Sequence, residues 1–199
     1  CANDPGYDAV WFARGGYGAC RIAEDAIAQF SAAAGNKQFL GYSDAGTLLG
    51  ALYRDRIGRL VHAPMVNDFV RDGGDAAVRR VLAWLSGDQS GLEPSIGKRP
   101  VVAFNLMTLA MLWGTRLMPG LAGHVVMVEE VSEYIYAVDR LGRVSDVPEN
   151  DRPFGAEAEA IARDWCARHA IAFLGNADIG HDAANRIVPF GLASDARHT

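Results

Sequence analysis

A serine at the end of an apolar run is the first residue whose type and place suggest chemistry. Ser43 lies in the sequence GYSD, after FLGY and before AGTLL, which could form a first helical turn. A serine at such a strand-to-helix turn projects its hydroxyl away from the sheet, and the next backbone N–H, that of Asp44, can stabilise an oxyanion. The motif is not GxSxG, and a serine in this place is also a common helix cap. Both roles stay open at this point.

A glycine-rich turn, RGGYG, precedes this serine and contains Arg14, Gly15 and Gly16. It follows a predicted strand and opens a predicted helix, so its backbone N–H groups would be exposed at the positive end of that helix. An oxyanion or a carboxylate could bind there. Such a turn can also be purely structural, and a dinucleotide site is disfavoured because GxGxxG is absent.

A serine nucleophile needs a general base and an acid that orients the base. The run HVVMVEE ends in two acids, which places Glu129 at the carboxyl edge of a strand, where the sites of α/β proteins gather. His181, in IGHD, lies in a loop that could reach over such a site. The alternatives are that Glu129 and Glu130 are solvated and that His181 is structural. His62 and His124 fall in or next to apolar strands, which favours a core role.

The elements that would position these residues alternate between short apolar runs and helical stretches. This alternation predicts an α/β fold with a largely parallel sheet. The clearest helical pattern covers residues 75–85, where Val78, Val81, Leu82 and Leu85 recur at helical spacing, and a second helix is expected at residues 155–169. Strands are expected at residues 8–13, 39–42, 60–63, 124–129 and 170–174.

The composition changes at residues 87–100, GDQSGLEPSIGKRP. These residues show neither helical nor strand periodicity in their apolar positions, which predicts a linker. We therefore expect an N-terminal α/β domain at residues 1–86 and a smaller C-terminal α/β domain at residues 101–199. A surface loop is expected at 147–153 and a frayed end at 194–199. The chain opens on CANDPGYDAVWFA, a turn that leads directly into a strand, so we expect a further N-terminal section to precede it.

The composition excludes several classes of partner. The chain has 199 residues, half of them hydrophobic, and a net charge of −5 without a basic stripe, which disfavours nucleic acid. The uncharged run at residues 100–115 falls short of the roughly 20 apolar residues that span a bilayer, so we interpret it as buried core. Three irregularly spaced cysteines predict no disulfide framework and suit a reducing cytoplasm. HExxH and CxxC are absent, so no metal or other cofactor is expected.

Six segments, taken together, resemble the LD-carboxypeptidases of peptidoglycan recycling, a family related to the microcin C immunity peptidases. The segments, in the family's order, are DAVWFARGGYGACRI, FLGYSDAGTLLGAL, HAPM, NLMTLAMLWGTRLMP, VVMVEEVSEYIYAVDR and GHDAANRIVPFG. The resemblance implies an N-terminal α/β domain that bears the serine and a C-terminal domain that bears the acid and the histidine. A linker joins them in the family, in agreement with the composition at residues 87–100.

By motif, the resemblance implies a catalytic triad of Ser43, Glu129 and His181. The serine would attack the peptide carbonyl, the histidine would take its proton, and the glutamate would hold the imidazole tautomer. The backbone N–H of Asp44 and one from the Gly15-Gly16 turn would form the oxyanion hole.

The family cleaves the bond between an L-centred diamino acid and a terminal D-alanine, so the implied partner is a muropeptide in the cytoplasm. Arg14 is a candidate to bind the free carboxylate of the substrate, and a structural role is the alternative. The stretch between residues 140 and 180 is shorter than in the family, which affects the expected substrate contacts of the C-terminal domain.

Three alternative functions remain open on the sequence. The chain could be a peptidase of the same family that acts on another peptide conjugate, as the microcin C type does. It could be a catalytically silent module that binds muropeptides, or a nucleotide-binding α/β domain that uses the RGGYG turn. A homodimer is also left open, since members of the family are often dimers.

Overall fold

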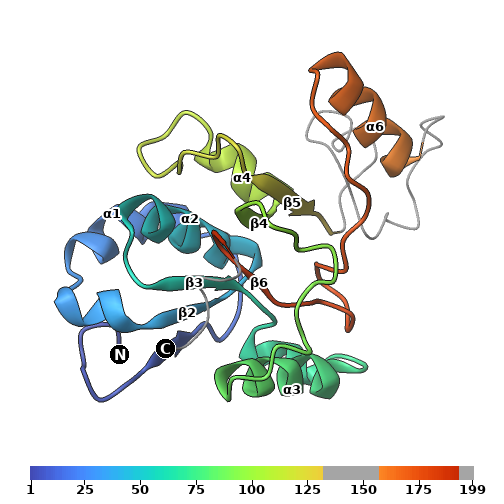
Figure 1. The fold of residues 1–199 in the computed structure, drawn as a ribbon. Helices are drawn as coiled ribbons and strands as arrows, with labels where there is room; N and C mark the ends of the chain where they lie inside the picture. Colours follow the sequence, from blue (N-terminus) through green and yellow to red (C-terminus); the bar gives the residue numbers. More distant parts are fainter. Residues whose placement is uncertain (132–156, 193–199) are drawn as a thin grey trace.

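The computed structural model describes residues 1–131 and 157–192 and has an α/β fold (Figure 1). The strands are β1 (Ala9–Trp11), β2 (Gln38–Gly41), β3 (Arg59–His62), β4 (Val101–Asn105), β5 (Val125–Glu129) and β6 (Val188–Pro189). The helices are α1 (Ala19–Ala28), α2 (Gly46–Asp55), α3 (Gly74–Leu85), α4 (Leu106–Leu112) and α6 (Ala158–Arg168), with 3-10 turns at Ala32–Asn36, Ser43–Ala45 and Val66–Val70.

The strands form two small sheets, and parallel pairing predominates as the sequence predicts. The larger sheet has the order β1-β2-β3-β6, in which β1, β2 and β3 are parallel and β6 is antiparallel to β3. The smaller sheet is the parallel pair of β4 and β5, with Asn105 opposite Glu129. Because β6 runs against β3 and pairs Val188 with His62, the residues before Val188 lie beyond the carboxyl end of β3.

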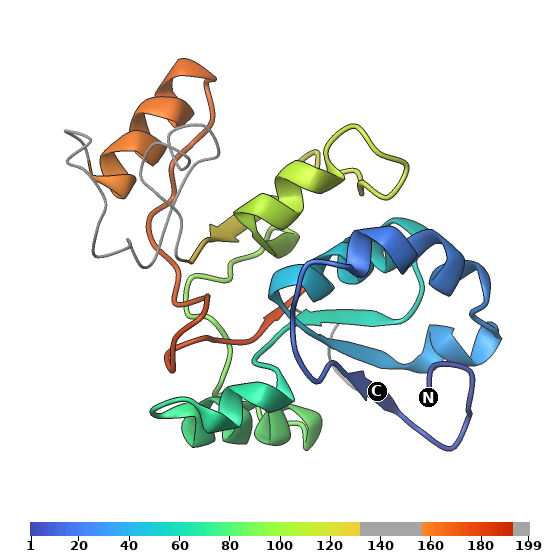
Figure 2. The same cartoon turned by 180° about the vertical axis from the view of Figure 1, so that it is seen from behind.

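Helices cover both faces of the larger sheet, with α1 and α2 on one side and α3 on the other (Figure 2). Successive residues of β2 point to opposite faces, as in any strand. Phe39 joins the core that includes Leu49 of α2, whereas Leu40 packs in a separate cluster with Val81 and Trp84 of α3. A sheet buried on both faces explains why these strands read as continuous apolar runs.

The uncharged run at residues 100–115 supplies both β4 and α4, and its strand is buried throughout. Helix α2 approaches this unit closely at Gly50, where a Cβ would lie 3.1 Å from Leu112 Cδ1 and 3.2 Å from Phe104 Cε1. Phe104 also packs edge-on against Phe190, with ring centroids 5.3 Å apart. The prediction of buried core is therefore confirmed for β4, while Trp113 at the end of α4 is exposed.

One predicted strand is absent from the structure. Residues 170–174 form no strand, since the structure pairs them with no neighbour among the described residues and leaves Ile171 and Leu174 exposed. Phe173 from this segment instead lies under the guanidinium of Arg163, 4.3 Å from Cζ to the ring centroid. The helix predicted at 75–85 is confirmed as α3, where the buried stripe is Ala77, Val81 and Trp84, and Leu82 is 51% exposed because the helix turns its Trp84 face to β2.

Other predictions agree or fall outside the described residues. The expected helix at 155–169 is observed as α6, which lies apart from both sheets (Figure 1). Residues 87–100 form no helix or strand, but Leu92 makes an isolated bridge with Ile187 and Glu93 is buried. The division into two domains stays a prediction. The expected loop at 147–153 and the expected frayed end at 194–199 lie outside the described residues.

None of the helices within residues 1–131 and 157–192 has the length and apolar character that a bilayer span requires.

Replacement of Phe104 by alanine should destabilise the fold strongly. Phe104 is 1% exposed and lies where β4, α2 and β6 meet, so the change removes buried apolar contacts and leaves a cavity. We expect a loss of about 3–5 kcal/mol in the free energy of unfolding, measured by urea denaturation. Phe69→Ala is the matched control, because Phe69 is 63% exposed and its loss should cost less than about 1 kcal/mol. Equal losses would contradict the described packing.

Candidate active site

Ser43 lies just beyond the carboxyl end of β2, at a sharp turn into α2. Its φ is 55°, so a non-glycine residue adopts the left-handed conformation at a cost of roughly 1–2 kcal/mol. Tyr42 before it is extended, and the 3-10 turn Ser43–Ala45 leads into the helix. Gly41 permits this path, because a Cβ there would lie 2.8 Å from Phe12 Cδ2. The turn directs the Ser43 hydroxyl out of the sheet edge.

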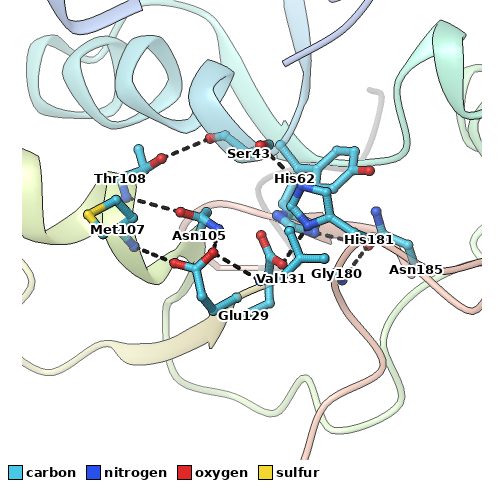
Figure 3. A network of polar contacts seen from close by, with 12 residues as sticks. Ser43, His62, Asn105, Met107, Thr108, Glu129, Val131, Gly180, His181 and Asn185 are labelled. Carbon is cyan, nitrogen blue, oxygen red and sulfur yellow. Dashed lines mark hydrogen bonds and ion pairs between the residues drawn. The ribbon is translucent and has the colours of Figure 1, made fainter. Parts of the chain in front are cut away.

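A histidine and a carboxylate follow this hydroxyl in a continuous line of hydrogen bonds (Figure 3). Ser43 Oγ lies 3.2 Å from His181 Nε2, and His181 Nδ1 lies 2.8 Å from Glu129 Oε2. Because the carboxylate accepts the Nδ1 proton, Nε2 is left as the atom that accepts from the hydroxyl. The structure thus brings together three residues that are far apart in sequence.

The burial of the two acids excludes one sequence interpretation. Glu129 is 3% exposed and Glu130 is 4% exposed, so neither is a solvated residue at a strand terminus. Glu129 is the last residue of β5 and faces His181, while Glu130 accepts a hydrogen bond from the side chain of Asn105. His181 itself keeps 12% of its side chain exposed, so the site remains open to solvent.

The loop that carries His181 is held from the side of β3. Asn185 Oδ1 accepts hydrogen bonds from Gly180 N at 3.2 Å and from His62 Nε2 at 3.0 Å. Gly180 has a φ of 135°, and a Cβ there would lie 3.4 Å from Glu129 Oε2. Glycine at this position therefore lets the loop pass close to the carboxylate. His62 is 1% exposed, which agrees with the core role expected for it.

A second set of contacts holds the histidine from the side of β2. The Tyr42 ring lies 4.8 Å from the His181 ring, and Arg71 Nη1 donates to the backbone oxygen of His181 at 2.6 Å. Tyr42 donates its hydroxyl to Asp68 Oδ1 at 3.0 Å. Burial, helped by the negative charge of Asp68, raises the pKa of Tyr42 well above its usual value, so the phenol stays protonated.

Sequence reasoning missed four of these supporting residues, namely Asp68, Arg71, Asn185 and Tyr42. Asp68 and Arg71 lie in a segment without a strong period, and Asn185 follows the histidine by four residues. Only Tyr42 carried a signal, as the residue that directly precedes the serine in GYSD.

The glycine turn also lies beside Ser43. A Cβ built at Gly15 would come within 3.0 Å of Ser43 Oγ, and one at Gly16 would lie 3.7 Å from Asp44 Oδ2. Asp44 Oδ2 accepts a hydrogen bond from the first N–H of α1, which ties this helix to the serine turn. Arg14 is exposed, and its Nε donates to the carbonyl of Gly15 at 3.1 Å. The structure thus places Arg14 at the start of the glycine turn, with a hydrogen bond to Gly15 and none to Ser43 or His181.

The described residues contain no cluster of three or more histidine, cysteine or acidic side chains arranged to bind a metal ion. All three cysteines are free, and Cys1 and Cys20 are exposed.

Residues 1–63 match the LD-carboxypeptidase N-terminal domain family, and this range includes the glycine turn and Ser43. The murein tetrapeptide carboxypeptidase of Pseudomonas aeruginosa is 25% identical over an alignment 229 residues long. The alignment covers 94% of this chain and 71% of that protein.

Solved structures have a similar fold. The muramoyltetrapeptide carboxypeptidase from Oxalobacter formigenes matches with a TM-score of 0.74 and 23% identity, over 96% of this chain and 74% of that one. The microcin C7 self immunity protein MccF, in complex with aspartyl sulfamoyl adenosine, matches with a TM-score of 0.74 and 16% identity, over 94% and 72% of the two chains. At these identities the likeness shows a common fold.

The buried His62 should make stability depend on pH. Burial lowers the pKa of His62 below its usual value near 6.5, so the unfolded chain binds a proton below about pH 6.5 that the folded chain does not. The free energy of unfolding should therefore fall as the pH drops from about 6.5 to 5, by up to about 1.4 kcal/mol per pH unit for this one group.

His62→Gln tests this assignment, because glutamine does not titrate and its amide can still donate to Asn185. Urea denaturation at several pH values should show a shallower decline for the variant than for the wild type. Parallel pH profiles for the two proteins would contradict the role of His62.

Proposed function

Because the chain belongs to the LD-carboxypeptidase family, we propose that it is a serine carboxypeptidase that removes the terminal D-alanine from peptidoglycan tetrapeptides. Ser43 is the nucleophile, His181 the general base and Glu129 the acid that orients it. The observation that carries this proposal is the line from Ser43 Oγ to His181 Nε2 at 3.2 Å and from His181 Nδ1 to Glu129 Oε2 at 2.8 Å.

The proposed reaction has two halves. Ser43 Oγ attacks the carbonyl carbon of the bond to D-alanine while His181 Nε2 takes the hydroxyl proton. The tetrahedral intermediate collapses to an ester on Ser43, and His181 gives the proton to the amine of the departing D-alanine. Water then attacks the ester with the same histidine as base, which releases the tripeptide and restores the serine. Glu129 stays ionised and stabilises the imidazolium in both halves.

The oxyanion hole is proposed to consist of the backbone N–H of Asp44 and one from the Gly15-Gly16 turn. The support is steric, since the absence of a Cβ at Gly15 keeps the space beside Ser43 Oγ open. Donors held in fixed positions at a developing oxyanion are often the largest single contribution to such catalysis.

Arg14 is the proposed contact for the free carboxylate of the substrate. Its guanidinium is exposed next to the glycine turn, and only its Nε has a hydrogen-bond acceptor among the described residues, the carbonyl of Gly15. A guanidinium binds a carboxylate through two parallel N–H groups, which fits recognition of a terminal carboxylate. Cytoplasmic location and a homodimer remain predictions from the resemblance.

A peptide conjugate of the microcin type is the second candidate substrate. The fold matches the Oxalobacter formigenes carboxypeptidase and MccF with the same TM-score of 0.74, so the fold favours neither substrate. A muropeptide is placed first because the murein tetrapeptide carboxypeptidase is a relative along 94% of this chain.

The first test is mass spectrometry of a tetrapeptide that ends in D-alanine, incubated with the wild type, Ser43→Ala and Glu129→Gln. We expect the wild type to release one D-alanine and Ser43→Ala to release none. Glu129→Gln should lower kcat by about 10³- to 10⁴-fold, because the imidazole loses the acceptor that fixes its tautomer.

Aspartyl sulfamoyl adenosine serves as the competing substrate in the same assay. Cleavage of this compound but not of the tetrapeptide would replace the muropeptide assignment by the conjugate. Binding of the tetrapeptide without cleavage by the folded wild type would support a silent muropeptide-binding module instead.

Gly15→Ala should strongly reduce turnover without unfolding the chain. The added methyl group would lie 3.0 Å from Ser43 Oγ and so crowd the hydroxyl and the proposed oxyanion hole. We expect kcat to fall by at least about 100-fold, the loss typical of one missing oxyanion donor.

Gly18→Ala is the matched control from the same turn, because a Cβ there meets nothing within 4 Å. Its kcat should stay close to that of the wild type. Equal activity of Gly15→Ala and Gly18→Ala in a steady-state assay would remove the glycine turn from the catalytic site.

A further inference from the structure

Glu130 is a buried carboxylate that the proposed mechanism does not use. It is the neighbour of Glu129, but it accepts hydrogen bonds from Asn105 Nδ2 at 2.8 Å, from Met107 N at 2.9 Å and from Val131 N at 2.9 Å. A carboxylate at 4% exposure is costly to bury unless donors of this kind surround it. Two of these hydrogen bonds join Glu130 to the N-cap and the first turn of α4, so the carboxylate holds this turn in place.

The contact with Glu130 determines how the Asn105 amide is oriented. Because Nδ2 donates to Glu130, the amide oxygen of Asn105 faces the other way and accepts from Thr108 N at 3.1 Å. This is the N-cap hydrogen bond of α4, the bond that orders the first turn of a helix. Glu130 thus fixes the turn of α4 that carries Thr108.

Thr108 connects this turn to the candidate nucleophile. Its Oγ1 donates to the backbone oxygen of Ser43 at 3.3 Å, and the threonine is only 3% exposed, so bulk water does not readily replace the contact. The same oxygen of Ser43 also accepts from Gly46 N at the start of α2. Two donors from different elements therefore hold the carbonyl of this residue.

Ser43 needs such support because its backbone is strained. A left-handed φ of 55° persists at a non-glycine residue only where surrounding contacts hold it. Rotation of the Ser43 peptide would also move Oγ from its position 3.2 Å from His181 Nε2. A contact to the backbone oxygen can therefore control the reach of the side chain.

We propose that Thr108 and Glu130 are positioning residues for Ser43. Glu130 orients Asn105, Asn105 caps α4, and the hydroxyl of Thr108 holds the carbonyl of Ser43 in the conformation that directs Oγ at His181. The kinetic consequence rests on the proposed peptidase function, whereas the geometric consequence does not.

Thr108→Val tests the proposal, because it keeps the shape of the side chain and removes the hydroxyl. We expect kcat for the tetrapeptide to fall by about 10- to 100-fold with little change in KM, since a displacement of about 1 Å at a reacting atom can cost about 100-fold. Thr108→Ser restores the donor and should keep kcat within about threefold of the wild type.

Thr47→Val is the matched control. Thr47 is a fully buried threonine in the first turn of α2, and its hydroxyl has no hydrogen-bond partner among the described residues. The same substitution there should leave kcat and KM unchanged. A similar loss of kcat in both valine variants would overturn the proposal, because it would show a general response of the core to the lost hydroxyl.

Crystal structures of the wild type, Thr108→Val and Thr47→Val give a readout that needs no substrate. In Thr108→Val alone, we expect Ser43 to leave the left-handed conformation or its Oγ to move away from His181 Nε2. An unmoved Ser43 would overturn the proposal whatever the activity.

If the wild type cleaves neither the tetrapeptide nor aspartyl sulfamoyl adenosine, the proposed function fails while the Ser43 geometry still decides this inference. Should Thr108→Val not fold, Glu130→Gln takes its place. There the amide NH2 must face either Met107 N or the pair of donors Asn105 Nδ2 and Val131 N, so at least one of these hydrogen bonds is lost. The same displacement of Ser43 is expected.

Discussion

The hydrogen bond between His181 and the buried carboxylate of Glu129 is the constraint on which the rest of the site depends. At 3% exposure the carboxylate has lost nearly all its water, and the imidazole supplies a donor in return. Leaving either group buried without its partner would cost several kcal/mol, so the loop and the end of β5 must meet. The parallel register of β4 and β5 and the antiparallel pairing of β6 with β3 bring the two segments to that meeting point.

Around this pair, contacts from three other segments hold Ser43 and His181. His62 of β3 holds the histidine loop through Asn185 of that loop, and Arg71 holds the backbone of His181 from the segment before α3. Thr108 reaches Ser43 from α4. Side chains whose positions are fixed by such neighbours keep a reactive geometry ready before a substrate arrives, which is the physical basis of preorganisation.

The sequence predicted what depends on short range patterns. Strands 39–42 and 60–63, helix 75–85 and the parallel arrangement follow from apolar runs and periodicity, and the structure confirms them within one or two residues. Residues 170–174 show the limit of this argument, because an apolar run becomes a strand only where a neighbour offers backbone hydrogen bonds. The juxtaposition of Ser43, Glu129 and His181 came from the family resemblance, since no local pattern encodes contacts over such separations. Contacts such as that of Thr108 with Ser43 depend on how α4 packs, and the spacing of residue types along the sequence does not predict them.

The long sequence separation of the site has a consequence for how the protein matures. Ser43 and His181 are 138 positions apart, and Glu129 and His181 are 52 apart, so the contacts between them close large loops. Such contacts form late, because the entropy of loop closure must be overcome before they contribute any stability. During synthesis the serine turn leaves the ribosome long before its histidine exists. A growing chain can therefore fold its first strands and helices before the hydrogen bonds that join Ser43, His181 and Glu129 can form, and these bonds close only when the segment that ends in β6 pairs with β3.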